Sequence, residues 1–274
     1  MKVGVLIPRL VDGVDEKFKK AADLGFESCQ VSGWDIETFT DELAKSIAEA
    51  SAKYGVNISG FWCGWSGPAK WNFTEGPITL GIVPEEYRKE RIENLKRGSD
   101  FAKKIGVKNL ITHVGFLPEN MTDPEFPKVV EAIREVALHC KKNGQNFLFE
   151  TGQETPVTLL RTIEEVATGN LGINLDPANL IMYGKANPVD ALDVFGKYVM
   201  DIHAKDGTYP TNGKELGPEV PLGKGKVNFP LFVKKLREIG YDGSLTIERE
   251  ISGEEQTREI IAGKKLLEDL IGEA

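Results

Sequence analysis

The sequence predicts an α/β protein folded as a single (β/α)8 TIM barrel, with residues 1–274 forming one domain. The main observation is a rhythm in which short apolar runs alternate with longer segments of helical period along the whole chain. Eight strand-then-helix units fit this rhythm with nothing left over. Consecutive units of this kind imply parallel strands with right-handed crossovers, and eight of them can close into a barrel without an edge.

Each element is expected from its local pattern. The first helix has Phe18, Ala21 and Ala22 at helical spacing, and the second has Leu43 and Ile47 on one side. The strands are expected at 3–7, 28–31, 56–62, 109–113, 146–150, 171–176, 199–203 and 243–248. The helices are expected at 15–24, 38–54, 84–106, 124–142, 156–167, 188–195, 230–239 and 254–271.

An open, doubly wound sheet is the alternative to the barrel. A dinucleotide-binding sheet of that type needs Gly-x-Gly-x-x-Gly after its first strand, and the sequence has none there. We also find no internal repeat, low-complexity segment or linker that would mark a second domain.

Composition excludes several classes of protein. The net charge of -8 disfavours a surface that follows a phosphate backbone, so we expect no nucleic-acid partner. Cys29, Cys63 and Cys140 form neither a disulfide framework nor a Cys-x-x-Cys metal pattern, which is typical of the reducing cytoplasm. The N-terminal apolar run is too short for a signal peptide, and no stretch approaches the roughly 20 apolar residues of a membrane span.

The last four strands each end in a group that binds metals. Alternate side chains of a strand face the same way, so on strand five Leu148 and Glu150 share one face while Phe147 and Phe149 pack toward the helices. The same alternation places four such groups at inward-facing strand ends, where barrel enzymes have their active sites: Glu150, Asp176, His203 and Glu248.

Three carboxylates gathered in a barrel would repel one another unless a positive charge lay among them. A divalent cation is the simplest solution, and one imidazole with three carboxylates suits Mn²⁺, Mg²⁺ or Co²⁺, with Zn²⁺ possible. The alternative is that each acid only caps a helix or pairs with a neighbouring lysine.

Five segments extend this pattern: Phe149-Glu150-Thr151, Asn174-Leu175-Asp176-Pro177-Ala178-Asn179, His203-Ala204-Lys205-Asp206, Leu222-Gly223-Lys224-Gly225 and Leu245-Thr246-Ile247-Glu248. In this order they resemble the sugar phosphate isomerase/epimerase family of the xylose isomerase-like TIM barrel superfamily. The resemblance implies that Glu150, Asp176, His203 and Glu248 hold one divalent metal. It also implies that Glu150 and Glu248 are the catalytic acid/base pair.

The activity implied by this resemblance is a metal-dependent isomerase or epimerase. Its substrate would be a ketose, a ketose phosphate or a related keto-polyol, converted through an enediolate in carbohydrate metabolism. The metal would chelate the substrate's carbonyl and adjacent hydroxyl. The family also suggests a homodimer or homotetramer built through exposed outer helices.

Three other functions stay open at this point. An inosose-type dehydratase begins with the same proton abstraction, and the family's epimerases commonly have a histidine where this chain has Asn179. An apurinic endonuclease-like phosphodiesterase needs several metals and more histidines than the three of this chain. A non-catalytic sugar-binding barrel is the last alternative.

Four residues are expected to contact substrate: His113, Lys205, Trp62 and Lys224. Trp62 begins a loop whose tryptophans either cover a sugar's C-H face or pack an insertion. Lys205 either meets a substrate oxygen or neutralises a neighbouring acid. Lys224 belongs to a glycine-rich loop before a helix, which is either an anion site or a tight turn with solvated lysines.

Three further residues could bind a metal or react, but each has a simpler explanation. Glu250 shares the parity of Glu248 and is the alternative ligand, although it is expected beyond the strand. His139 is expected to be structural because it lies within a helix. Cys63 lacks an obvious base partner and is expected to be inert.

Overall fold

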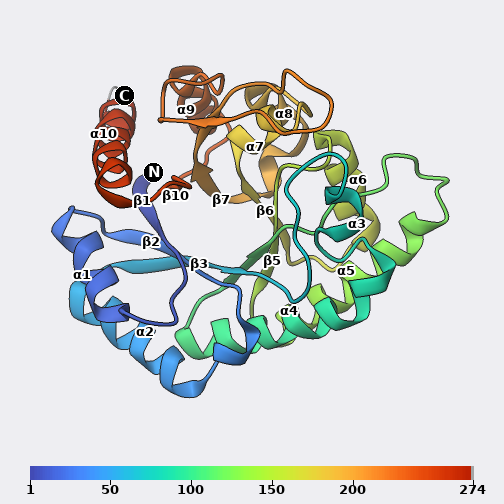
Figure 1. Cartoon of the computed structure of the whole chain (residues 1–274), viewed down its shortest axis with the longest axis horizontal. Helices are drawn as coiled ribbons and strands as arrows, with labels where there is room; N and C mark the ends of the chain where they lie inside the picture. The colour runs from blue at the N-terminus through green and yellow to red at the C-terminus, as the bar shows by residue number, and fades with distance from the viewer. Residues whose placement is uncertain (273–274) are drawn as a thin grey trace.

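The computed structural model describes residues 1–272 and shows in them a closed barrel of eight parallel strands surrounded by helices (Figure 1). Around the barrel the strand order is β1-β10-β7-β6-β5-β4-β3-β2. The predicted (β/α)8 fold is therefore confirmed. The N-terminus begins β1 close to the C-terminal helix α10, where the barrel closes (Figure 1).

Every predicted strand and helix is present, with ends that differ by a few residues. The barrel strands are β1 (Lys2–Ile7), β2 (Ser28–Gly33), β3 (Asn57–Cys63), β4 (Asn109–Thr112), β5 (Asn146–Glu150), β6 (Leu171–Leu175), β7 (Val199–Ala204) and β10 (Ser244–Ile247). The outer helices are α1 (Val14–Asp23), α2 (Asp41–Tyr54), α4 (Glu85–Ile105), α5 (Glu125–Lys142), α6 (Pro156–Val166), α8 (Pro188–Phe195), α9 (Phe229–Glu238) and α10 (Gly253–Gly272). Short additional elements are η1 (Ile36–Thr38), α3 (Gly76–Thr79), α7 (Pro177–Met182), η2 (Gly196–Tyr198), β8 (Asp206–Gly207) and β9 (Glu219–Val220).

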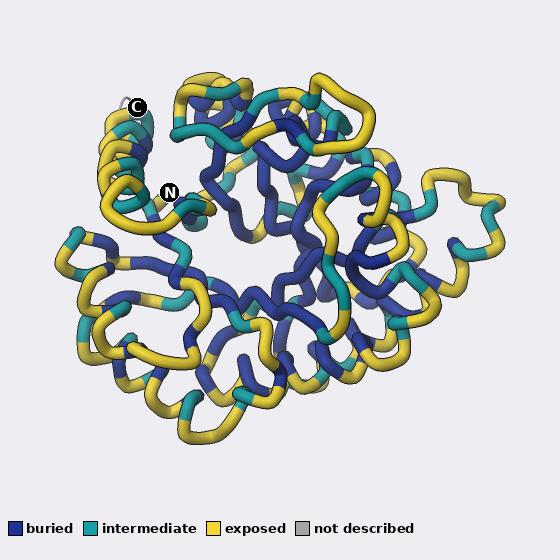
Figure 2. Tube along the Cα trace, viewed as in Figure 1, coloured by how far each residue is buried: buried dark blue, intermediate teal, exposed yellow. Residues whose placement is uncertain are grey.

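The strands alternate between two environments, as expected for a barrel wall. Phe147 and Phe149 belong to the main core, which packs the strands against the helices. Leu148 and Ile111 instead join Trp62 in a smaller apolar cluster inside the barrel. Figure 2 shows the strands as a buried centre within a partly exposed outer layer. The inward parity on which the site prediction depends is therefore present on β5.

The expected strand 171–176 is one residue too long. β6 ends at Leu175, and Asp176 is the N-cap of the unpredicted helix α7, accepting a hydrogen bond from Asn179 N at 2.9 Å. Pro177 follows at the first helical position, where its fixed φ and missing N–H suit a helix start. The Asp-Pro pair thus ends the strand and turns the chain within one residue.

Strict alternation along the strand predicts Met200 on the apolar face with Ile202 and Ala204. Met200 does not lie on that face. The pairing of β6 with β7 shifts register between Ile173 and Asn174, so Met200 is an extra residue in β7. A Cβ added at Gly172 would come within 2.6 Å of Met200 Sδ, which shows that Met200 packs over this glycine. The bulge restores the alternation at Asp201, and His203 still faces inward.

The long β3–α4 loop is pinned by a buried cation, Arg91 of α4. Its guanidinium has no exposed surface and donates to four backbone carbonyls, those of Ser66, Pro68, Thr79 and Gly81, at 2.6–3.0 Å. Four otherwise unpaired carbonyls are satisfied by one side chain. The loop is therefore held firmly against the barrel end that carries the site.

Residues 1–272 include no helix that is both long enough and apolar enough to cross a lipid bilayer.

Candidate metal centre and active site

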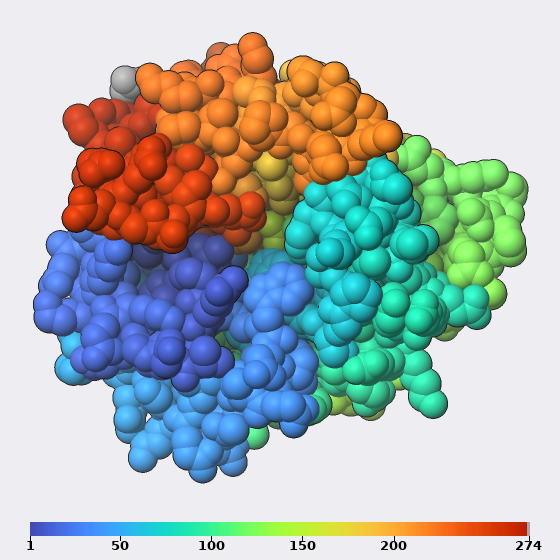
Figure 3. Space-filling view, in the orientation of Figure 1, coloured from blue at the N-terminus to red at the C-terminus, as the bar shows by residue number. Residues whose placement is uncertain are grey.

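Glu150, Asp176, His203 and Glu248 converge at the C-terminal end of the barrel. Each offers one donor atom, and these atoms all lie within 4.8 Å of one another. They come from the end of β5, the residue after β6, the body of β7 and the residue after β10. Figure 3 shows a hollow at the centre of this face, bordered by N-terminal segments, the β3–α4 loop and the segment after β7.

His203 points one ring nitrogen at the three acids. Its Nδ1 lies 3.0 Å from Glu150 Oε1, 3.2 Å from Glu248 Oε2 and 4.0 Å from Asp176 Oδ2. The opposite nitrogen, Nε2, lies 2.7 Å from Gln30 Oε1. Because an amide oxygen can only accept, this contact places a ring proton on Nε2. Glu150 and Glu248 raise the pKa of His203 well above its usual range, so without a cation Nδ1 is also protonated, and it becomes a ligand lone pair when a metal displaces that proton.

Gln30 is in turn held by Asn174, and this pair was missed by sequence reasoning. Gln30 Nε2 donates to Asn174 Oδ1 at 2.9 Å, and neither side chain has exposed surface. Gln30 comes from the middle of β2, far in sequence from His203. A metal-binding histidine typically donates its second N–H to such an acceptor, which orients the ring.

The donor set fits a divalent metal. Asp176 Oδ1 is occupied by its capping hydrogen bond, but Oδ2 is buried without a hydrogen-bond partner in the described chain. Together with His203 Nδ1, it aims at the space shared by the carboxylates of Glu150 and Glu248. One imidazole nitrogen and three carboxylate oxygens suit a hard or borderline divalent ion.

Without a cation, the pKa values of the three acids depend on how much of the neighbouring positive charge each one faces. Burial raises the pKa of Asp176 to about 7, although Lys205 opposes the rise. Burial would also raise the pKa of Glu248, but Lys205 and His203 outweigh it and lower that pKa to about 2. Burial would likewise raise the pKa of Glu150, but His113 and His203 outweigh it and hold that pKa well below its usual range.

Glu150 is oriented by several neighbours. Trp62 Nε1–H donates to Glu150 Oε2, and His113 Nε2 and Asn179 Nδ2 each lie 3.4 Å from Oε1. The structure thus places Trp62 and His113, both expected to contact substrate, directly beside the expected catalytic carboxylate. Asn179, the position where the resemblance departs from the epimerases, contacts the same carboxylate.

All four tryptophans of the chain gather beside this cluster. The ring of Trp34 lies 4.9 Å from Trp62, 5.4 Å from Trp65 and 6.4 Å from Trp71, between centroids. The Trp71 ring also lies 5.2 Å from His113. Trp34, which follows β2, was missed because it is isolated in sequence from the other three. The arrangement provides an aromatic wall on one side of the acids.

Lys205 lies among the acids on the other side. Its buried Nζ is 2.9 Å from Glu250 Oε1, 3.2 Å from Glu248 Oε2 and 3.7 Å from Asp176 Oδ2. Glu250 is the more exposed carboxylate and lies outside the four-residue cluster. Of the two glutamates considered as ligands, Glu248 is thus the one placed with the other three.

Lys224 does not join the cluster. Its side chain is exposed, and the backbone N–H groups of Gly223, Gly225 and Val227 donate to the carboxylate of Asp206. The backbone donors of this loop are therefore engaged by an acid of the chain itself, and the exposed Lys224 matches the alternative of a turn with solvated lysines.

Glu154, in the β5–α6 loop, is a second residue that sequence reasoning missed. It is almost completely buried, yet neither carboxylate oxygen accepts a hydrogen bond of normal geometry in the described chain. Burial raises its pKa to about 7, with His113 and nearby backbone amides only partly opposing the rise. A buried acid beside an active site can bind a hydroxyl group or exchange a proton.

His139 and Cys63, which were not expected to take part in catalysis, lie in environments that agree with this expectation. His139 Nε2 lies 2.8 Å from Asp100 Oδ1 on the outer helices, away from the cluster. Cys63 is fully buried, and burial raises the pKa of its thiol, which disfavours the reactive thiolate.

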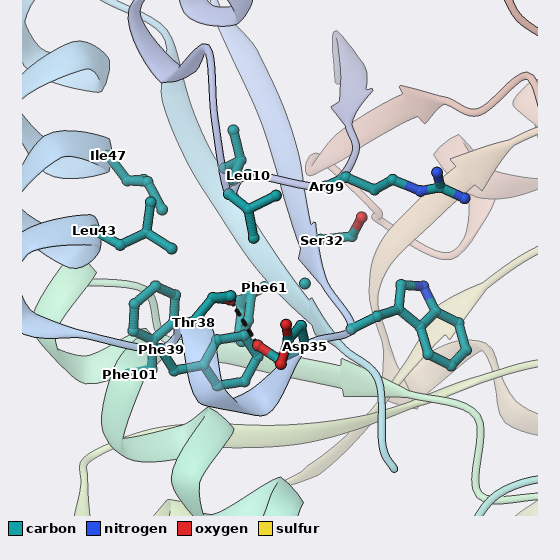
Figure 4. Close-up of a pocket in the computed structure, with 13 residues that line it drawn as sticks. Arg9, Leu10, Ser32, Asp35, Thr38, Phe39, Leu43, Ile47, Phe61 and Phe101 are labelled. Carbon is teal, nitrogen blue, oxygen red and sulfur yellow. Dashed lines mark hydrogen bonds between the residues drawn. The ribbon is translucent and has the colours of Figure 1, made fainter. Parts of the chain in front are cut away.

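A separate cavity of about 410 Å³ lies between α2 and the ends of β1 and β2 (Figure 4). Its lining is mainly apolar, with Leu43 and Ile47 on one wall and Phe39 and Phe101 at its floor. In Figure 4 the side chain of Arg9 extends away from this apolar end. None of the four clustered residues lines the cavity, but Trp34 does, so the cavity adjoins the aromatic wall and does not include the candidate metal centre.

Comparisons with known proteins agree with the geometry. Residues 18–270 match the family model described as xylose isomerase-like TIM barrel. A crystal structure of a xylose isomerase domain protein from Planctomyces limnophilus is 35% identical, with a TM-score of 0.92 over 98% of this chain and 96% of that one. A D-tagatose 3-epimerase-like protein has 23% identity and a TM-score of 0.75, covering 99% and 97% of the two chains. An uncharacterized protein of Methanocaldococcus jannaschii is 27% identical, covering 99% of this chain and 89% of its own length.

Proposed function

We propose that this chain, which belongs to the xylose isomerase-like TIM barrel family, is a divalent-metal-dependent isomerase or epimerase of ketoses or related keto-sugars. The observation that carries the proposal is the convergence of four ligand atoms within 4.8 Å, with the His203 ring held by Gln30 so that its Nδ1 faces the acids. The D-tagatose 3-epimerase-like neighbour shares the fold and is in keeping with this class of reaction.

Glu150, Asp176, His203 and Glu248 would hold the metal. A metal bound there supplies a Lewis acid that polarises a carbonyl oxygen, an effect worth several kcal/mol. His203 is restricted to binding because its other nitrogen is engaged by Gln30.

Glu150 and Glu248 are the proposed acid/base pair. They project from β5 and from the end of β10, which are separated around the barrel by β6 and β7. A sugar carbon between them is exposed to one carboxylate on each face. One glutamate removes the proton next to the carbonyl, and the other returns a proton to the opposite face. A lowered pKa keeps the glutamate that removes the proton ionised, whereas its partner must already carry the proton that it delivers to the opposite face.

The remaining residues bind and orient the substrate. The four tryptophans cover the apolar C-H face of a sugar ring or chain. Lys205 and His113 lie on either side of the acids, where their N–H groups can donate to substrate oxygens. Glu154 supplies a buried acceptor for a hydroxyl group beyond His113.

The test is isotope exchange. Protein loaded with Mn²⁺ is incubated in D₂O with ketoses, ketose phosphates and keto-inositols, and the products are followed by NMR. We expect deuterium to enter next to the carbonyl of an accepted substrate without net loss of water. Loss of water from the product would assign a dehydratase instead, and no exchange across the panel would contradict the proposal.

Matched variants identify the proton-transfer groups. Glu150→Gln and Glu248→Gln should each reduce exchange by roughly 10²- to 10⁴-fold. Glu49→Gln, at an exposed position on α2, is the control and should leave exchange unchanged. Metal content is measured for every variant, so that loss of a ligand is separated from loss of a base. Full exchange by Glu150→Gln would remove this residue from the mechanism.

A further inference from the structure

The loop between β9 and α9 has the form of an anion-binding site. It runs through Gly223 and Gly225 toward Asn228, the N-cap of α9, and several backbone N–H groups converge within it. TIM barrels often bind a substrate's phosphate group in this region, after strands seven and eight. Convergent backbone N–H groups are the chemistry that such a site uses.

In this chain the loop closes on the carboxylate of Asp206. Asp206 Oδ2 accepts from Gly223 N at 3.0 Å and from Gly225 N at 2.9 Å. Its Oδ1 accepts from Gly207 N at 2.9 Å and from Val227 N at 3.2 Å. Asp206 is 2% exposed. Four backbone donors that could bind phosphate oxygens are therefore committed to one buried side chain.

The fit leaves no room for a second anion. A Cβ added at Gly225 would come within 2.1 Å of Asp206 Oδ1, so carboxylate and backbone are in close contact. A phosphate brought to the loop would meet a fixed negative charge at hydrogen-bonding distance, which is strongly unfavourable in a buried setting.

The neighbouring cations do not compensate. Lys205 is buried among Glu248, Glu250 and Asp176, where its charge is already balanced. Lys224 is exposed, so its charge is screened by solvent.

We propose that Asp206 is a specificity-determining residue, a built-in anion that takes the place of a substrate phosphate and restricts this enzyme to unphosphorylated sugars. The inference rests on the proposed function for the identity of the substrate as a sugar. The exclusion of phosphate, however, is a property of the loop and can be measured by binding alone.

The loop has anchors that do not depend on Asp206. Lys224 N donates to Pro221 O and Lys226 N donates to Gly207 O, both at 2.9 Å. The β8–β9 pair also fixes the base of the loop. Replacing the carboxylate should therefore leave donors near their present positions and create room for an external anion.

The experiment compares wild type, Asp206→Ala and Asp206→Asn, each titrated with inorganic phosphate at constant ionic strength set by chloride. Asp35→Ala is the matched control, because Asp35 also accepts a backbone N–H but at an exposed site. Phosphate binding is read from thermal unfolding and from ³¹P NMR. We expect Asp206→Ala to bind phosphate at least about tenfold more tightly than wild type, since charge-assisted hydrogen bonds are regained. Asp35→Ala should behave as wild type.

A second measurement keeps the test independent of variant folding. In wild type, the amide ¹H–¹⁵N signals of Gly223, Gly225 and Val227 should not move when inorganic phosphate is added. Movement of these signals, or a folded Asp206→Ala that gains no phosphate affinity, would overturn the proposal. Should both variants fail to fold, the wild-type amide signals decide alone. Failure of the isomerase proposal is seen separately, as absence of deuterium exchange.

Discussion

Replacing Gln30 by leucine should weaken Mn²⁺ binding by roughly 10- to 100-fold, although Gln30 is not a ligand. The reason is the contact of Gln30 Oε1 with His203 Nε2 at 2.7 Å, which fixes the tautomer and orientation of the ring. Without this acceptor, the ring can rotate or carry its proton on Nδ1, and either change competes with the metal. The expected loss corresponds to about 1.4–2.7 kcal/mol of binding free energy.

The same substitution carries a separate cost in folding. Leucine removes the acceptor for His203 and the donor to Asn174 Oδ1, which lies 2.9 Å from Gln30 Nε2. Both partners are completely buried, so no water replaces the lost contacts. At roughly 1–3 kcal/mol for each of the two orphaned groups, the free energy of unfolding of the metal-free protein should fall by about 2–6 kcal/mol.

The assay measures both quantities on the same protein. Mn²⁺ affinity is obtained by electron paramagnetic resonance or calorimetry, and stability by urea unfolding in chelator. Gln145→Leu is the matched control. Gln145 is also buried and hydrogen-bonded, to Ser99 and Val107, but it lies just before β5, at the end of the strand opposite to Glu150. It should lose stability and keep its metal affinity. Gln30→Glu retains an acceptor for His203 and should bind Mn²⁺ nearly as well as wild type.

A folded Gln30→Leu that binds Mn²⁺ as tightly as wild type would show that the contact with His203 does not set metal affinity. An equal loss of metal affinity in Gln145→Leu would show the same, because the effect would then report general loosening of the barrel.

Three other outcomes test different parts of the structure. Glu154 binds its proton more tightly when folded, since its pKa rises from 4.5 to about 7, so stability falls as pH increases across this window. The free energy of unfolding of Glu154→Gln, measured in urea, should therefore match that of wild type near pH 5 and exceed it by up to about 3 kcal/mol at pH 8. Identical pH profiles of stability for the two proteins would refute the raised pKa. Arg91→Lys should cost roughly 3 kcal/mol or more, because one ammonium group cannot reach the four carbonyls that the guanidinium satisfies, and a stability near wild type would show that the loop does not need this clamp. In Mn²⁺ at 100 times the wild-type Kd, the free energy of unfolding should be about 2.7 kcal/mol higher than in chelator. At the same Mn²⁺ concentration Glu150→Gln should show a smaller difference between the two conditions, because it lacks one ligand.

The barrel and the four clustered residues could be predicted because both depend on local pattern. Strand and helix periods are visible in short windows, and parity within a strand determines which side chain faces inward. Glu150 and His203 needed only this parity. Asp176 also reached the cluster, although it caps α7 and does not end β6, because the helix cap holds it at the same strand end.

The rest of the site depends on contacts that no local pattern contains. Gln30 looks like an ordinary polar residue within β2, and its role appears only when closure of the barrel brings it to His203, 173 positions away. Trp34 is separated in sequence from the tryptophans that it joins. For Asp206, sequence shows both the acid and the glycine loop but does not show that one fills the other. The bulge at Met200 arises from pairing between strands, which single-strand parity cannot reveal.

The gathering of all four tryptophans has an optical consequence. Because every indole of the protein lies beside the candidate active site, intrinsic fluorescence excited at indole wavelengths comes from that region alone. Trp34 and Trp71 are 37% and 39% exposed, so a bound sugar would shift their emission and shield them from a soluble quencher. Rings this close also exchange excitation energy, which makes the emission a collective signal. The protein therefore carries an intrinsic fluorescent reporter with which ligands can be screened without labels and without a turnover assay.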